Sequence, residues 1–179
     1  MDKIKLDKYV TMPSSMLPTN KLVKYWEMLL ECDLIGDRFP EVDKCGKTPE
    51  KEYMSIITDI APMMHYVVDT DTLEVIAEFT ISDIFGKVGL IHFSFSPLET
   101  PQTALMVCRT TTDRIIREWR NSENPEEPYV RALAGLTPIK NHRACRFIKR
   151  VGFKPKTVIP FGAIYDNQEC DALVTVKTL

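Results

Sequence analysis

Apolar residues recur every three to four positions in four stretches of the chain, which is the spacing of helices that bury one face. The first stretch follows Pro18, and a second is expected over residues 48–62. A third, longer helix is expected from Thr100, because a capping hydroxyl followed by proline suits a first helical turn. The fourth covers about residues 138–151, and Gly152 is expected to end it.

The apolar period changes to two in six other stretches, which is the pattern of strands with one buried face. Three of them are joined by short turns and predict an antiparallel meander over residues 64–68, 73–81 and 88–96. The other three predict a strand and then a hairpin, at residues 129–136, 157–165 and 170–179. The predicted order is helix, helix, three strands, helix, strand, helix and two strands.

Size and composition place the chain among globular proteins. It has 179 residues, 44% apolar and 27% charged, which predicts one domain over residues 1–179. A disordered, collagen-like or disulfide-scaffold protein is excluded. Seven side chains on the apolar faces are expected to be buried: Trp26, Ile57, Ile91, Phe93, Ile116, Trp119 and Phe147.

Charge and cysteine content narrow the function classes. Lys and Arg number 23 against 25 Asp and Glu, a balance that disfavours nucleic acid as a partner. The five cysteines are far apart and lack metal-ligand spacing, so we expect reduced thiols and no metal site. No apolar run is long enough to enter a membrane and the start lacks a signal-peptide pattern, so we expect a cytoplasmic protein.

The segment LAGLTPIKNHRACRFIKRVGFKP, residues 133–155, resembles the fourth motif region of the GNAT acyltransferase superfamily. The matching residues are Asn141, Ala144, Gly152 and Phe153, with Phe147 at the usual apolar position. The element order is also similar from about Leu22 to the C-terminus. The resemblance implies a single α+β domain whose central mixed, mostly antiparallel sheet is flanked by about four helices.

The resemblance also implies an activity, the transfer of acetyl from acetyl-CoA to a primary amine of a small molecule or a protein. The implied cofactor contacts lie on the central strand, at the following helix start and on the last helix: Phe93, Ser94, Phe95, Thr100, Gln102, Thr103, Asn141, Ala144 and Phe147. The residues alone leave other roles open. Asn141 equally suits a helix cap, and Ala144 suits ordinary helix propensity.

The predicted phosphate-binding segment departs from the family pattern. The family places glycines there to expose backbone N–H groups to the cofactor, but no glycine occurs between Gly89 and Gly135. Pro101 lacks an N–H group and Glu99 adds a negative charge. We expect the Thr100 hydroxyl to occupy the nearby N–H groups itself, which argues against ordinary cofactor binding.

Proton transfer needs a group of matched pKa near the amine. Many family members use a tyrosine on the last helix, where this chain has Ile148. His92 is the best candidate base, because it shares one strand face with Ser94 and Ser96, and Glu78 is the second. A half-buried histidine is also often just a packed residue.

Seven basic residues without an intervening acid follow the motif start: Lys140, Arg143, Arg146, Lys149, Arg150, Lys154 and Lys156. An ordinary solvated helix face explains them. The alternative is an anion site for CoA phosphates, an acidic partner or nucleic acid. Helical spacing places Arg143, Arg146 and Arg150 on one ridge.

A non-catalytic protein of the same fold is the second hypothesis. A compact chain with this helix motif and a glycine-free phosphate loop also resembles proteins of tailed bacteriophages, some of which are tied to head assembly or lie inside the virion. That resemblance implies a phage structural protein as partner, and the host cytoplasm or the virion as location. The missing glycines and Ile148 favour this hypothesis, while Asn141, Ala144, Gly152 and Phe153 favour the enzyme.

Overall fold

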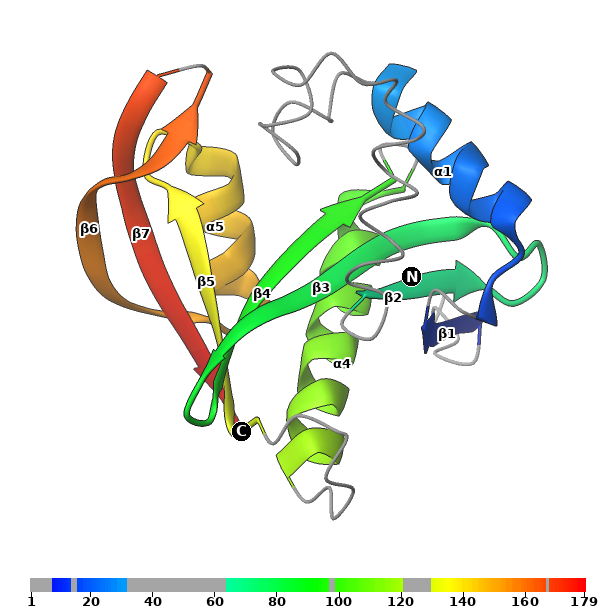
Figure 1. Ribbon diagram of the computed structural model, residues 1–179, viewed down its shortest axis with the longest axis horizontal. Helices are drawn as coiled ribbons and strands as arrows, with labels where there is room; N and C mark the ends of the chain where they lie inside the picture. Colours follow the sequence, from blue (N-terminus) through cyan, green and yellow to red (C-terminus); the bar gives the residue numbers. More distant parts are fainter. Residues whose placement is uncertain (1–7, 14–15, 32–63, 97–98, 121–129, 167) are drawn as a thin grey trace. The chain divides into compact units, whose positions relative to one another are not determined.

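The computed structural model describes residues 8–13, 16–31, 64–96, 99–120, 130–166 and 168–179. Figure 1 shows their helices and strands. In chain order these are β1 (Tyr9–Pro13), α1 (Thr19–Glu31), β2 (Met64–Asp69), β3 (Val75–Phe85), β4 (Val88–Phe95), α4 (Pro101–Arg120), β5 (Ala132–Pro138), α5 (His142–Val151), β6 (Lys154–Tyr165) and β7 (Gln168–Thr178).

The strands form one sheet in the order β1-β2-β3-β4-β5-β7-β6. The pairs β1–β2, β2–β3, β5–β7 and β6–β7 are antiparallel, and β4–β5 is parallel. This is the mixed, mostly antiparallel sheet of an α+β domain that the resemblance implies. Three helices lie in the described ranges, and the further helix expected over residues 48–62 lies outside them.

Two compact units make up the chain. The first comprises Met1–Thr80 and Phe93–Ala104, and the second comprises Ile81–His92 and Leu105–Leu179. β3, β4 and α4 contribute residues to both units. The prediction of a single domain over residues 1–179 stays a prediction.

The core of the first unit forms where α1 covers β2 and the start of β3. The helical spacing of apolar residues on α1 turns one face inward, and the ring of Tyr25 meets the ring of Tyr66 edge-on at 6.1 Å between centroids. Val10 and Met12 of β1 pack against this cluster. Its buried members are Leu17, Leu22, Tyr25, Trp26, Leu29, Tyr66, Val68 and Val75.

The second unit buries the apolar stripe of α4 and a narrow stripe of α5. On α4 the buried apolar residues are Val107, Cys108, Ile115 and Ile116, which follow the helical spacing seen in the sequence. On α5 only Ile148 and Val151 are buried. The remaining face of α5 is left for polar and charged side chains.

Several element boundaries differ from those expected. The sequence pattern does not predict β1, because all five of its residues are partly buried and no alternation marks it. The last helix begins at His142 rather than near Pro138, since Pro138 ends β5 and Asn141 caps α5. β6 starts three residues before the expected Thr157.

The expected core is confirmed in part. Trp26, Ile91 and Ile116 are buried. Phe93 and Phe147 are only partly buried, so the expectation is wrong for these two, and Phe147 lies outside the stripe that α5 buries. Of the other two predictions, Ile57 lies outside the described residues, and the side chain of Trp119 on α4 is also outside the described part of the structure.

Candidate active site

The parallel pair at the centre of the sheet is short. β4 and β5 pair at three positions, from Val88 with Ala132 to Leu90 with Ala134. β5 continues to Pro138 and keeps its full antiparallel ladder with β7 on its other edge. Within the described second unit, the β4-facing edge of β5 therefore offers backbone groups beyond Ala134 that no strand ladder uses.

His92 lies on β4 two residues beyond Leu90, the last position paired with β5, and is partly buried. Glu78, the other predicted base, lies on β3 opposite Tyr66 of β2 and is fully buried. The two residues belong to different units, with His92 in the second and Glu78 in the first. His92 is thus the more accessible of the two candidates.

The end of β4 has one polar face and one aromatic face, as the alternation predicts. The hydroxyl groups of Ser94 and Tyr25 are 3.1 Å apart, and the Ser96 hydroxyl donates to the sulfur of Met28 at 3.2 Å. Both partners lie on α1. The rings of Phe93 and Phe95 instead group with Phe79 of β3, at centroid distances of 5.8 to 6.3 Å: Phe79–Phe93, Phe79–Phe95 and Phe93–Phe95.

Tyr25 is a candidate that sequence reasoning missed. It lies on α1 among the residues of the buried cluster, and it is itself buried. The structure adds that its phenol hydroxyl reaches Ser94 on the central strand. A phenol can donate a proton, and only knowledge of the partner strand distinguishes such a tyrosine from an ordinary core residue.

The start of α4 is closed by its own cap. The Thr103 N–H group donates to the Thr100 hydroxyl oxygen at 3.2 Å, and the two threonine hydroxyls are 3.0 Å apart. The Ala104 N–H group donates to the Thr100 carbonyl at 3.0 Å. The expectation that the Thr100 hydroxyl occupies nearby N–H groups is confirmed for the N–H group of Thr103. Pro101 has no N–H group. In the first turn of α4, only the backbone N–H group of the exposed Gln102 is therefore left without a described partner.

Glu99 lies just before this helix and is partly buried. Burial raises the pKa of its carboxyl group above the ordinary value; Lys8 opposes this shift and Asp69 adds to it. A carboxylate at this position repels an anion. The start of α4 therefore does not fit a pyrophosphate in the way that an open helix N-terminus would.

The start of α5 is also capped. The side-chain oxygen of Asn141 accepts the Ala144 N–H at 2.9 Å, and the Asn141 carbonyl accepts the Cys145 N–H at 2.9 Å. The capping role, one of the two open alternatives, is therefore present. The cap uses the Oδ1 atom, and the Nδ2 group of the same side chain keeps two donors. Asn141, Ala144 and Phe147 are partly buried, and Ile148 is buried.

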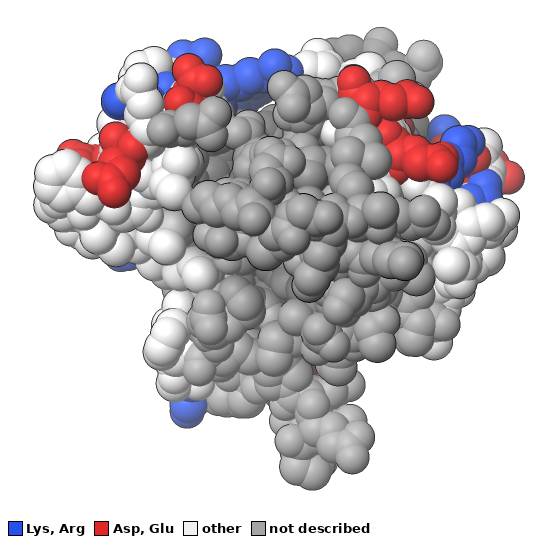
Figure 2. Space-filling view, turned by 45° about the horizontal axis from the view of Figure 1, so that its top comes forward, with Lys and Arg blue, Asp and Glu red and all other residues white. Residues whose placement is uncertain are grey.

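A cavity of about 430 Å³ lies in the first unit, between α1, the start of β3 and the segment after β4. Its lining includes Tyr25, Met28 and Ser96, the residue directly after β4. At the upper right of Figure 2, acidic and basic side chains gather side by side, over the part of the molecule where Figure 1 draws α1.

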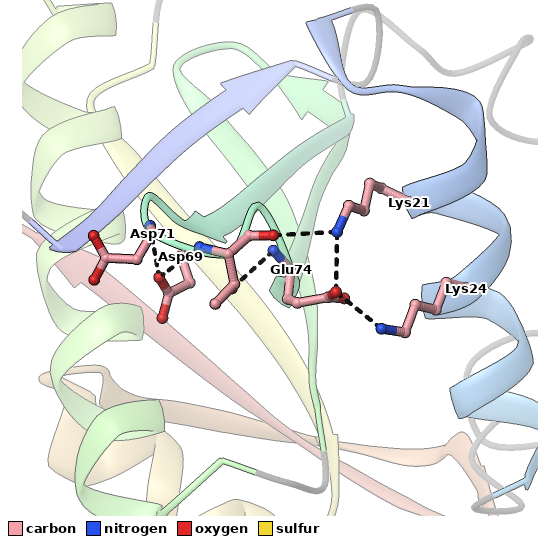
Figure 3. Close-up of polar contacts among 6 residues, drawn as sticks. Lys21, Lys24, Asp69, Asp71 and Glu74 are labelled. Atoms are coloured by element: carbon pink, nitrogen blue, oxygen red, sulfur yellow. Dashed lines mark hydrogen bonds and ion pairs between the residues drawn. The ribbon is translucent and has the colours of Figure 1, made fainter.

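The two lysines of this cavity are both held by one carboxylate. Lys21 and Lys24 each lie 2.9 Å from Oε1 of Glu74, and Lys21 also donates to the Thr72 carbonyl at 3.1 Å (Figure 3). Hydrogen bonds from Lys24 and Lys21 hold the pKa of Glu74 below its ordinary value. Three further carboxylates line the cavity, those of Glu27, Glu31 and Glu99. The lining thus presents more negative than positive charge.

The described residues show no metal or membrane feature. No group of three or more His, Cys, Asp or Glu in the described ranges is placed to hold a metal ion. Cys108, Cys145 and Cys170, the three described cysteines, are free thiols. None of the helices of the described chain has the length and apolar character needed to span a membrane.

Neither models of known protein families nor curated protein sequences match this sequence. Solved structures do match. An acetyltransferase of the GNAT family from Bacillus anthracis is 12% identical with a TM-score of 0.68, over 96% of this chain and 95% of that one. The ribosomal-protein-S5-alanine acetyltransferase from Vibrio fischeri is 12% identical with a TM-score of 0.65, over 99% and 97%.

A third similar structure is RimL, a ribosomal L7/L12 alpha-N-protein acetyltransferase in complex with coenzyme A. It is 8% identical with a TM-score of 0.71, over 96% of this chain and 94% of that one. All three similarities extend over nearly the whole of both chains, although few residues are identical. The protein therefore has the fold of the GNAT acetyltransferases.

Proposed function

We propose that this protein is an N-acyltransferase that moves acetyl from acetyl-CoA to a primary amine. The observation that carries the proposal is the short β4–β5 ladder, whose last pair at Leu90 lies two residues before His92, in a chain with the GNAT fold. The unpaired backbone groups of an open strand edge can hydrogen-bond an amide-containing ligand, and a titratable side chain near it can accept a proton from the attacking amine.

The residues present fit the amide-rich arm of acetyl-CoA but not its phosphate end. Acetyl-CoA supplies a thioester whose acyl group an amine can attack, and its amide-rich arm suits the open edge of β5 in the second unit. The Nδ2 group of Asn141, with Ala144 and Phe147, would flank that arm. The phosphate end lacks its usual cradle, because Pro101 and the Thr100 cap leave few donors at the start of α4.

His92 is proposed as the base that takes the proton of the attacking amine, with Glu78 as the second candidate. We expect His92→Gln to lower kcat about hundredfold, the usual contribution of a general base, while the protein stays folded. His142→Gln is the matched control, because His142 is exposed on α5. The measurement is release of the CoA thiol. Equal rates for the two variants would remove His92 from the reaction.

Tyr25 is proposed as the acid that protonates the leaving thiolate of CoA, through its hydroxyl group, which is hydrogen-bonded to that of Ser94. Tyr25→Phe keeps the ring that packs against Tyr66 and removes only the hydroxyl. We expect a drop of about tenfold in kcat and an unchanged melting temperature. A variant with the wild-type kcat would leave Tyr25 a core residue.

The acceptor is proposed to be a cationic amine, because the cavity beside α1 is lined by four glutamates and only two lysines. The RimL and S5 enzymes named above act, by their names, on ribosomal proteins. A peptide α-amine and a small polyamine are therefore the first acceptors to try in the thiol-release assay. Thiol release that does not depend on any added amine would contradict an amine acceptor.

A non-catalytic role remains the second candidate, and the closed start of α4 is the observation that favours it. The partner in that case is the phage structural protein implied by the sequence resemblance, with the virion as an alternative location. A folded protein that shows no stability gain with millimolar acetyl-CoA would support this candidate over the enzyme.

A further inference from the structure

Positive charge is concentrated in one part of the second unit. Residues 131–165 carry eight of the 23 Lys and Arg residues and none of the 25 Asp and Glu residues. The chain as a whole has a net charge of -2, so the rest of it is strongly acidic. This segregation creates a local field that the balanced total conceals.

The α5 helix displays most of this charge. Arg143, Arg146 and Arg150 are exposed on one ridge, while the helix buries only Ile148 and Val151. None of the three arginines forms an ion pair with another residue of the described chain. Their guanidinium groups are therefore available to carboxylates of a partner.

Along the chain, the charged ridge is followed by a strand with exposed apolar side chains. Gly152, in the left-handed conformation with φ 109°, ends α5, and β6 begins two residues later with Lys154 and Lys156, both exposed. β6 is the last strand of the sheet order. It exposes four large apolar side chains: Val158, Ile159, Phe161 and Ile164.

A bulge in β6 holds Phe161 outward. Its side chain is 76% exposed and its φ is 54°, a left-handed conformation that a bulky residue rarely adopts. The Phe161 N–H donates to the Asp171 carboxylate at 3.2 Å. A Cβ atom on Gly162 would lie 2.9 Å from the side chain of Ile159, so only glycine fits there. The structure maintains an exposed aromatic ring at the expense of backbone strain.

This edge is not built to accept another strand. Pro155 and Pro160 lack N–H groups, and the register of β6 against β7 shifts near Thr157 and between Ile159 and Ala163. Strand addition by a peptide, or edge pairing with a second copy, is disfavoured. A partner must instead contact the side chains.

The apolar part of the surface determines the class of partner. Nucleic-acid interfaces are polar and strongly positive throughout, whereas protein interfaces combine an apolar centre with arginine and a polar rim. Burial of the apolar side chains of β6, among them Phe161 and Ile164, is favourable only against another apolar surface. We propose that α5 and β6 form a docking surface for an acidic protein segment that carries apolar side chains between its Asp and Glu residues.

The test uses the full chain and a fluorescein-labelled 20-residue peptide of alternating Glu, Asp and Leu, followed by fluorescence anisotropy. We expect Arg143→Gln with Arg146→Gln and Arg150→Gln to weaken binding at least tenfold. The matched control is Arg114→Gln with Arg117→Gln and Arg120→Gln, the same charge change on exposed positions of α4, and should alter binding less than twofold. Equal losses in both triple variants would overturn the proposal.

The apolar half of the proposal has its own variant. Phe161→Asn removes the ring and suits a left-handed backbone, so folding should persist; binding of the peptide should fall at least fivefold. Arg146→Glu is the fallback where the triple variant does not fold, with the same expected tenfold loss. Unchanged binding of the Phe161 variant, or tighter binding of a 20-residue oligothymidylate than of the peptide, would overturn an acidic protein as the partner.

Discussion

Lys177 shows what a single buried charge does in this protein. The side chain is 5% exposed, and its ammonium group donates to the Thr112 hydroxyl at 2.6 Å and to the Arg109 carbonyl at 3.3 Å. It also pairs with Asp113 at 2.8 Å and lies 5.9 Å from the centre of the Phe153 ring. One residue near the end of β7 thereby connects that strand to α4.

Replacing Lys177 tests this connection. We expect Lys177→Met to lower the free energy of unfolding by about 2 kcal/mol, since it removes hydrogen bonds to a charged group and leaves Asp113 only partly hydrated. Urea denaturation measures the change. Lys149→Met, the same substitution on the exposed face of α5, should stay within about 0.5 kcal/mol. Similar effects of the two substitutions would mean that Lys177 contributes no specific stability.

Asn141 can be tested for two roles separately. Serine also caps helices well, so Asn141→Ser should keep the free energy of unfolding within about 0.5 kcal/mol, whereas Asn141→Ala should lose about 1 kcal/mol. Both variants lack the Nδ2 donors. If these donors contact acetyl-CoA, both should weaken its binding by about 1 to 2 kcal/mol, measured by calorimetry. Normal affinity in the serine variant would restrict Asn141 to capping.

Glu99 gives a prediction about pH. Its folded-state pKa is raised, chiefly by burial, so this group favours folding below the ordinary carboxyl pKa and loses that contribution as pH rises through the folded value. At pH 7 Glu99→Gln should therefore raise the melting temperature, and at pH 4 the gain should shrink. Glu31→Gln, at an exposed position, is the control. A lower melting temperature for the Glu99 variant at pH 7 would contradict the sign.

At the scale of elements, the sequence pattern predicts most of the fold. The period-two runs locate six of the seven described strands and the helical spacing locates α1, α4 and α5, because each of these elements buries one face. The pattern does not predict β1, because its five residues are all partly buried and do not alternate. The pattern also does not predict the bulge at Phe161, because the bulge depends on the pairing of β6 with β7 and on the hydrogen bond to Asp171.

The candidate site is predictable only where local chemistry decides it. The Thr100 cap follows from a hydroxyl placed before a proline, and the alternation of Ser94 and Ser96 with Phe93 and Phe95 follows from the pleat of β4. The bond between Tyr25 and Ser94 joins residues 69 positions apart. A pattern read along the chain contains no information about that pairing.

The start of α4 gives an element-scale prediction. Pro101→Ala restores an N–H group and Thr100→Gly releases that of Thr103, while glycine remains an adequate cap. We expect the double variant to bind acetyl-CoA severalfold more tightly, because the helix start then offers donors to phosphates. Binding of acetyl-pantetheine, which lacks the diphosphate, should not change. Equal gains for both ligands would mean that the helix start does not contact phosphates.

At the scale of the molecule, a strong similarity of fold coexists with little similarity of sequence. The GNAT fold requires the order of elements and their buried faces, and these depend on spacing rather than on particular residues. Two of the motif residues also have a structural role, since Asn141 and Gly152 are the N-cap and the C-cap of α5. Activity requires specific side chains and donors, so it must be tested directly.

The most direct measurement is a calorimetric titration of the 179-residue chain with acetyl-CoA, paired with its melting temperature in the same buffer. We predict saturable heat and a melting temperature that rises with ligand concentration, because a ligand that binds only the folded state stabilises it. No heat and no rise at millimolar acetyl-CoA, from a protein that unfolds cooperatively, would contradict the proposed acetyltransferase.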